Sequence, residues 1–324
     1  DPLYKDDDNP TTKCDPCIES CADLDFVDQW GLFKVEADGS WNITTGSTSV
    51  VIAVLDSGID LDHDDLVDKI WTNPGEVDGD GIDNDGNGLI DDYHGADFVG
   101  DNTGDPLTDD PASQDGSPEI PMGIWDTTQI IPVFSGDPSV GDGVDNDGDG
   151  LPDLGVFHGT AVATLAAAMT DNLSIELPGE YEGMAGACWG CKIMPVRMVN
   201  AEGGGFGSDA AAAIYYATDM GADVLNLSWG FDLDTLDAAG EDEVAIITDA
   251  IDYAVNHGAI VVASSGNSGS EAVHFPASMD DTIAVGSSSW EDQRSTFSSY
   301  APAGEIPDNG LDDDGNGRID DVVD

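Results

Sequence analysis

Three short segments of the sequence repeat a pattern of acidic residues and glycine that could bind a metal ion. They are DNDGNGLIDD from Asp83, DNDGDGLPD from Asp145 and DDDGNGRIDD from Asp312. Aspartate or asparagine occupies positions one, three, five and nine of each segment, and glycine occupies position six. Alternate side-chain oxygens on a tight loop converge on one point, while the glycine permits the turn and the seventh residue offers its backbone carbonyl. Each segment therefore predicts a calcium-binding loop.

The predicted ligands come from positions one, three, five, seven and nine of each loop. They are Asp83, Asp85, Asn87, Leu89 and Asp91 in the first, Asp145, Asp147, Asp149, Leu151 and Asp153 in the second, and Asp312, Asp314, Asn316, Arg318 and Asp320 in the third. No loop has the glutamate that an EF-hand carries at position twelve. We therefore expect other residues or water to complete the coordination. The alternative is an Asp/Gly-rich spacer that binds no ion.

Two further segments carry a carboxylate and an imidazole in settings that suit catalysis. A β-branched apolar run, SVVIAVL, ends on Asp56, as expected for a buried parallel strand that leads into a loop. His158 opens an alanine-rich segment that predicts a helix. Taken singly, an aspartate after a strand is common in α/β folds, and a histidine before a helix is usually a cap or a surface residue.

Taken together and in this order, these segments resemble the subtilisin-like serine proteases, or subtilases. VIAVLDSGIDLDHDDL is similar to the family's segment around its catalytic aspartate, HGTAVATLAAA to that around its catalytic histidine, and VVASSGNSG to its oxyanion segment. The resemblance covers most of the chain from about residue 25 to residue 300. It implies that Asp56 orients His158, that His158 acts as general base and then acid, and that Asn267 stabilises the oxyanion.

The same resemblance implies where a substrate would bind. VLNLSWG is similar to the strand that lines the family's primary specificity pocket, which makes Ser228, Trp229 and Gly230 candidate substrate contacts. GGGFG is similar to the edge segment that pairs with an extended peptide, which adds Gly203, Gly204 and Gly205.

The nucleophile is the part of the family pattern that the sequence does not contain. The family carries its serine in a Gly-Thr-Ser-x-Ala-x-Pro segment after the oxyanion asparagine, and residues 1–324 hold no such segment. Three explanations are open: a longer chain, a second fragment that carries the serine, or a relative without a nucleophile. Because Asp56, His158 and Asn267 are all present, we expect one of the first two.

The elements that must position these residues alternate along the chain. We expect strands at 49–55, 192–199, 223–229, 259–264 and 282–287, and helices at 158–169, 208–220 and 243–257. This alternation predicts an α/β, subtilisin-like fold with a mostly parallel central sheet, helices on both faces and long Asp/Gly-rich calcium loops. The expected organisation is an N-terminal segment (1–48), a core (49–303) with a calcium-loop insertion (72–154), and the third calcium loop (304–324).

Composition restricts the partners and the compartment. Eight Lys and Arg against 67 Asp and Glu give a net charge of −59, which excludes nucleic acid and anionic membranes as favoured partners. No apolar run is long enough for membrane insertion and no signal peptide is visible, so we expect a processed, extracellular protein. The five cysteines, in clusters at 14–21 and 188–191, predict disulfides, with a metal site or free thiols as alternatives. Haem attachment is disfavoured because no histidine follows either Cys-x-x-Cys.

These observations predict a secreted, calcium-dependent serine endopeptidase that acts on peptides or proteins. Its own C-terminal fragment could supply the serine. The alternative is a catalytically inactive, calcium-binding scaffold or surface-assembly protein with the same fold.

Overall fold

The computed structural model describes residues 29–61, 63–99, 158–170, 184–199, 204–233 and 238–301. The first acidic loop lies within this part of the chain. The second and third loops, Gly203 and the cysteines at 14, 17 and 21 lie outside the described residues.

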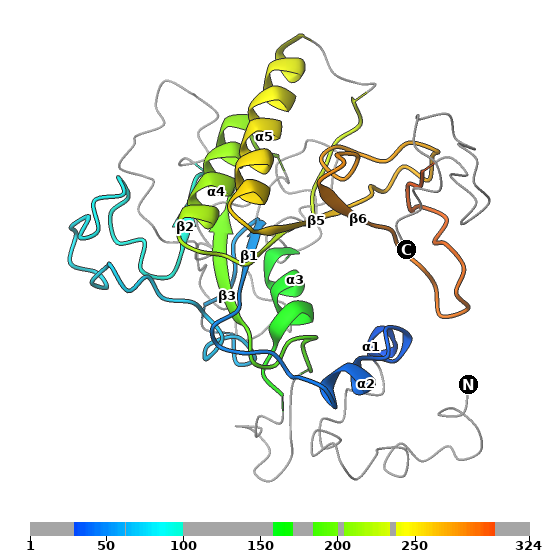
Figure 1. The fold of residues 1–324 in the computed structure, drawn as a ribbon, viewed down its shortest axis with the longest axis horizontal. Coiled ribbons are helices and arrows are strands. Elements are labelled where there is room, and N and C mark those ends of the chain that lie inside the picture. The colour runs from blue at the N-terminus through cyan, green and yellow to red at the C-terminus, as the bar shows by residue number, and fades with distance from the viewer. Residues whose placement is uncertain are drawn as a thin grey trace, which may run out of the picture.

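A parallel β-sheet forms the centre of the protein (Figure 1). Its strands lie in the order β2 (Ala96–Asp97), β3 (Lys192–Arg197), β1 (Val51–Asp56), β4 (Val224–Leu227), β5 (Ile260–Ser264) and β6 (Thr282–Val285). Every neighbouring pair is parallel. The α/β fold with a mostly parallel sheet is therefore confirmed.

Helices cover both faces of this sheet (Figure 1). They are α3 (His158–Ala167) on one face and α4 (Gly207–Asp219) with α5 (Ala238–Asn256) on the other, while the short helices α1 (Trp30–Lys34) and α2 (Ala37–Trp41) lie near the N-terminal side of the described chain. Side chains of β1 divide between the faces because successive residues of a strand point in opposite directions. Ala53 and Leu55 join the core with α4 and α5, whereas Val54 packs against Ala163 and Ala167 of α3.

The predicted strands and helices of the core are present, with bounds shifted by a few residues. The largest shift is in α5, which begins at Ala238 rather than at about 243. The hydrophobic pattern of the sequence did not predict β2, which has two residues, or the helices α1 and α2, which have five residues each. Elements this short contain too few residues to show a hydrophobic period. No helix of the described chain is both long enough and apolar enough to span a membrane.

Residues 30–34 are held by a segment far along the chain. Lys34 forms an ion pair with Asp292 at 2.9 Å, and the Trp30 and Trp290 rings meet edge to face with centroids 6.0 Å apart. The Lys34 ammonium also lies over the Trp290 ring. This contact joins the first described helix to the loop that follows β6.

Candidate active site

Asp56 and His158 meet at the carboxyl end of β1. Asp56 is the last residue of that strand and is only 3% exposed. The His158 Nδ1 atom lies 2.8 Å from Oδ1 and 2.9 Å from Oδ2 of Asp56. Oδ1 also accepts the backbone N–H of Ser57 at 2.7 Å, which fixes the carboxylate. The structure thus brings together two residues that are 102 positions apart in the sequence.

Gly159 allows this approach because it has no side chain. A Cβ atom at residue 159 would lie 2.2 Å from the carbonyl oxygen of Gly58 and 3.2 Å from the Cβ of Asp56. The Gly159 N–H instead donates to the Ser57 hydroxyl at 3.2 Å. The first turn of α3 is therefore seated directly on the loop that follows Asp56.

The environment of His158 favours its protonated form. The hydrogen bond to Asp56 raises the pKa of His158, burial opposes this, and the charge of Asp56 raises the pKa further. The imidazole is half exposed, so the ring can meet a reacting group from the open side. An imidazole with Nδ1 donating to a carboxylate has Nε2 available to accept a proton.

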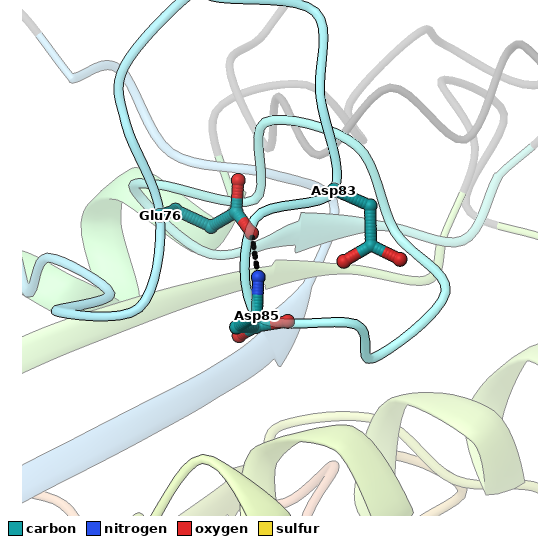
Figure 2. Close-up of side chains that lie close together, drawn as sticks. All are labelled: Glu76, Asp83 and Asp85. Carbon is teal, nitrogen blue, oxygen red and sulfur yellow. Dashed lines mark hydrogen bonds between the residues drawn. The ribbon is translucent and has the colours of Figure 1, made fainter.

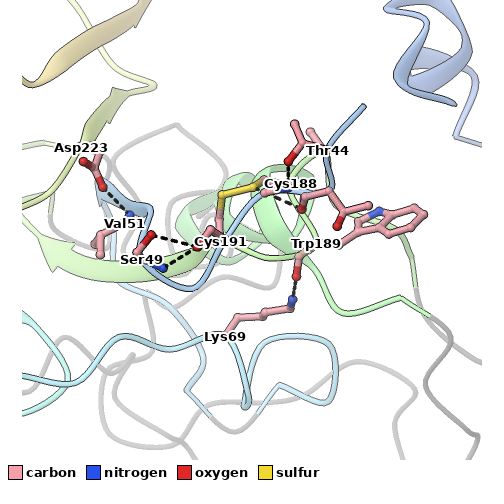
Figure 3. Close-up of a disulfide and its surroundings, with 12 residues drawn as sticks. Thr44, Ser49, Val51, Lys69, Cys188, Trp189, Cys191 and Asp223 are labelled. Carbon is pink, nitrogen blue, oxygen red and sulfur yellow. Dashed lines mark hydrogen bonds between the residues drawn. A yellow bond between two sulfur atoms is a disulfide. The ribbon is translucent and has the colours of Figure 1, made fainter. Parts of the chain in front are cut away.

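The far end of α3 is anchored by the segment that contains Cys188 and Cys191 (Figure 3). These two cysteines form a disulfide. The Cys188 N–H donates to Ala166 at 2.9 Å and the preceding residue donates to Leu165, so both cap the last carbonyls of the helix. Gly46 has a φ of +90°, and a Cβ there would collide with the Cys188 sulfur. The helix that begins at His158 is therefore fixed at both ends.

The candidate substrate contacts follow strands that neighbour β1. Ser228 follows β4 directly and accepts the Asn226 side-chain N–H at 2.8 Å, while Trp229 packs against the core. Gly230 is exposed, and a Cβ there would lie 2.7 Å from the carbonyl oxygen of Phe275. Because β4 is parallel to β1, these residues and Asp56 lie at the same edge of the sheet.

Asn267 and the glycine segment occupy the same edge. Asn267 is exposed and lies three residues after the end of β5, in a turn where Gly266 has a φ of +103°. Gly204 and Gly205 are exposed and lie just before α4. A Cβ at Gly205 would lie 2.5 Å from the carbonyl oxygen of Met198, so the glycine allows close approach to the end of β3.

A buried ion pair next to Asp56 was not predicted. Arg197 of β3 is paired in register with Asp56 on one side and with Asp97 of β2 on the other. Its guanidinium donates to Asp97 at 2.9 Å, and both side chains are less than a tenth exposed. Arg197 and Asp97 are the last residues of their strands. Only the order of the strands in the sheet places them beside Asp56.

The first acidic loop brings three carboxylates together, one of which the repeat did not predict. Oxygens of Glu76, Asp83 and Asp85 lie within 4.8 Å of one another (Figure 2). The Leu89 N–H donates to the side-chain oxygen of Asn87, and Asp91 accepts N–H groups from the preceding turn. Glu76 lies outside the repeat, and its signal in the sequence is weak: it is the only glutamate between residues 71 and 99.

A parallel α/β sheet with a carboxylate–imidazole pair at its carboxyl edge is an arrangement that suits hydrolytic enzymes. Comparison with known proteins identifies the family. The model of the subtilase family matches residues 47–310. The thermophilic serine proteinase of Bacillus sp. (strain AK1) is 31% identical over 88% of this chain and 49% of its own length. Thermitase of Thermoactinomyces vulgaris is 28% identical over 86% of this chain and 68% of its own length.

The chain belongs to the subtilase family. A solved protease from Pseudoalteromonas arctica shares its fold, with a TM-score of 0.59, 24% identity, and coverage of 86% of this chain and 69% of that one. The chain spans about half of the length of its Bacillus relative.

Proposed function

We propose that these residues form the acid–base half of the active site of a secreted serine endopeptidase of the subtilisin type. The observation that carries the proposal is the contact between the His158 Nδ1 atom and the buried Asp56 carboxylate. His158 Nε2 takes the proton of a serine hydroxyl as the oxygen attacks the peptide carbonyl, and later gives it to the leaving amine. Asp56 keeps the imidazole oriented and stabilises its positive charge.

The other roles follow from positions at the same edge of the sheet. Asn267 donates its side-chain N–H to the developing oxyanion. Ser228, Trp229 and Gly230 line the pocket for one substrate side chain, and the segment at Gly203, Gly204 and Gly205 pairs with the substrate backbone. The serine itself is contributed from outside residues 1–324, either by the same chain or by a second fragment.

Calcium dependence and secretion belong to this proposal. The acidic loops would otherwise repel themselves, and a cation that binds only the folded loops stabilises the fold by mass action. The Cys188–Cys191 disulfide and the net charge of −59 both suit an extracellular compartment. The alternative is an inactive calcium-binding scaffold. A negative result in the experiment below would favour it.

The test is the intact mass of the native protein in calcium, before and after a fluorophosphonate probe that labels an activated serine. We expect a mass well above 33.7 kDa, or a co-purifying fragment, with a single added label. A His158→Ala variant is the control and should take up no label, since the serine then lacks its base. A protein of 33.7 kDa that takes up no label would contradict the proposal.

A further inference from the structure

The first acidic loop buries negative charge that no basic side chain neutralises. Glu76 is 6% exposed and Asp92 is fully buried. Ion pairs of lysine and arginine in the described chain join Lys34 to Asp292 and Arg197 to Asp97, and none reaches the loop. A buried carboxylate without a counter-charge is costly, so this arrangement calls for a cation.

One of these buried carboxylates, that of Glu76, has an oxygen without a hydrogen-bond partner among the described residues. Oε1 of Glu76 accepts the N–H groups of Asn84 at 2.8 Å and of Asp85 at 3.0 Å, but its Oε2 has none. Asp92 accepts the side-chain amide of Asn87 at 2.9 Å through Oδ2, and the Tyr216 hydroxyl also interacts with it. Buried oxygens that are left unpaired are rare in native proteins and mark an unfilled interaction.

The carboxylates of Glu76, Asp83 and Asp85 are spaced as ligands of one ion. One oxygen from each lies within 4.8 Å of the other two. Oxygens that all bind one calcium ion at about 2.3–2.6 Å must lie this close together. Figure 2 shows Glu76 extending from the first arm of the loop toward the turn that carries Asp83 and Asp85.

Close packing holds Glu76 in this place. A Cβ on the preceding residue, Gly75, would lie 2.7 Å from the Cβ of Asp85. The side chain of Asn73 joins the two arms, since its Oδ1 accepts the Gly75 N–H and its amide donates to Asp85, each at 2.9 Å. The base of the loop is closed where the Asn73 N–H donates to the Tyr93 carbonyl at 2.7 Å.

Asp91 is not one of these three clustered carboxylates. Its two carboxylate oxygens accept the N–H groups of Asp80 and Gly81 at 2.9–3.2 Å. Its φ of +56° lies in the left-handed region. The repeat alone would assign Asp91 as the ligand at position nine.

We propose that a calcium ion binds Glu76, Asp83 and Asp85, with Glu76 as the buried ligand in place of Asp91. The proposal rests on the calcium part of the proposed function and makes it specific. Carboxylate oxygens favour calcium over the softer transition metals, and water or backbone carbonyls complete its six to eight ligands. Asn73 and Gly75 act as positioning residues that set the distance between the two arms.

The experiment compares Glu76→Gln with Asp91→Asn, which are matched because each removes one charge and keeps the shape of the side chain. Native mass spectrometry counts the bound calcium ions per chain, and hydrogen exchange follows peptides within residues 73–95. We expect E76Q to carry one ion fewer than the wild type and to lose calcium-dependent protection in these peptides, whereas D91N keeps both. Loss of the ion in D91N, or its retention in E76Q, overturns the proposal.

The melting temperature in chelator separates a ligand from a residue that is merely structural. Without calcium, Glu76 is a buried, uncompensated charge, so E76Q should melt at or above the temperature of the wild type in chelator, yet below it in calcium. An E76Q protein that melts lower than the wild type in both conditions overturns the ligand role. Neither readout depends on peptide hydrolysis, so a failure of the protease proposal can be told apart from a failure of this one.

Discussion

The Nδ1 atom of His158 lies almost equally far from the two carboxylate oxygens of Asp56, at 2.8 Å and 2.9 Å. One partner sits at the end of a central strand and is buried, while the other begins a helix and is half exposed. In the proposed mechanism, the buried residue therefore fixes the orientation of the imidazole and the exposed one meets the reacting group.

Asp56→Asn should lower kcat of the intact, active protein by about four orders of magnitude while its fold is kept. An asparagine amide in this position donates to the imidazole and stabilises the wrong tautomer. Hydrolysis of a peptide substrate at saturating concentration gives kcat, and the melting temperature checks the fold. A decrease of less than about tenfold would mean that this pair does not orient the base.

The pH dependence should follow the raised pKa of His158, which is caused first by the hydrogen bond to Asp56. Because a general base must be neutral, the acid limb of kcat/KM should lie above the ordinary histidine value of 6.5 and move down in Asp56→Asn. The same contact stabilises the fold fully at pH values below the unfolded-state pKa, and this stabilisation is lost as the pH rises through the folded-state pKa. NMR titration of the His158 ring measures the shift, and an identical titration in both proteins would contradict the assignment.

Gly159→Ala should destabilise the protein by about 1–3 kcal/mol and reduce activity, because the added methyl group displaces the first turn of α3 from Gly58. Gly39→Ala is the matched control. Gly39 is also helical, but no atom lies within 4 Å of its would-be Cβ, so this variant should be neutral or gain up to about 1 kcal/mol. Urea unfolding measures the free energy of unfolding of both variants. Equal changes in the two variants would rule out the steric explanation.

Arg197→Met should lower the free energy of unfolding by about 3–5 kcal/mol, since it removes the guanidinium that neutralises the buried Asp97 carboxylate. The double variant Asp97→Asn with Arg197→Met should recover much of this loss. Lys34→Met removes the partner of the exposed Asp292 carboxylate and should cost at most about 1 kcal/mol. If the double variant is no more stable than Arg197→Met alone in urea unfolding, the buried charge is not the cause.

Local patterns in the sequence were sufficient to predict the central elements of the fold and the place of Asp56. A continuous apolar run predicted β1, and alanine-rich segments predicted α3 and α4, because burial and helix propensity act over a few residues. The meeting of Asp56 with His158 followed only from the family resemblance, since 102 residues separate them. The roles proposed for Ser228, Gly204 and Asn267 stay predictions.

The residues that sequence reasoning missed depend on contacts between distant segments. Arg197 and Asp97 become partners only because β2 adds to the edge of β3 in one particular register. Glu76 joins Asp83 and Asp85 only because the loop folds back over Gly75. Neither arrangement leaves a periodic pattern in the sequence from which it could be predicted.

The contact between Lys34 and Asp292 has a consequence for the order in which the chain assembles during synthesis. The two residues are 258 positions apart. At about 5–20 residues per second, a ribosome needs on the order of 13–50 seconds to make the intervening chain. Throughout that interval Trp30 has no Trp290 to pack against, although α1 precedes every strand of the sheet in the sequence. The contact between this helix and the loop after β6 therefore forms late, after the strands of the sheet have been synthesised.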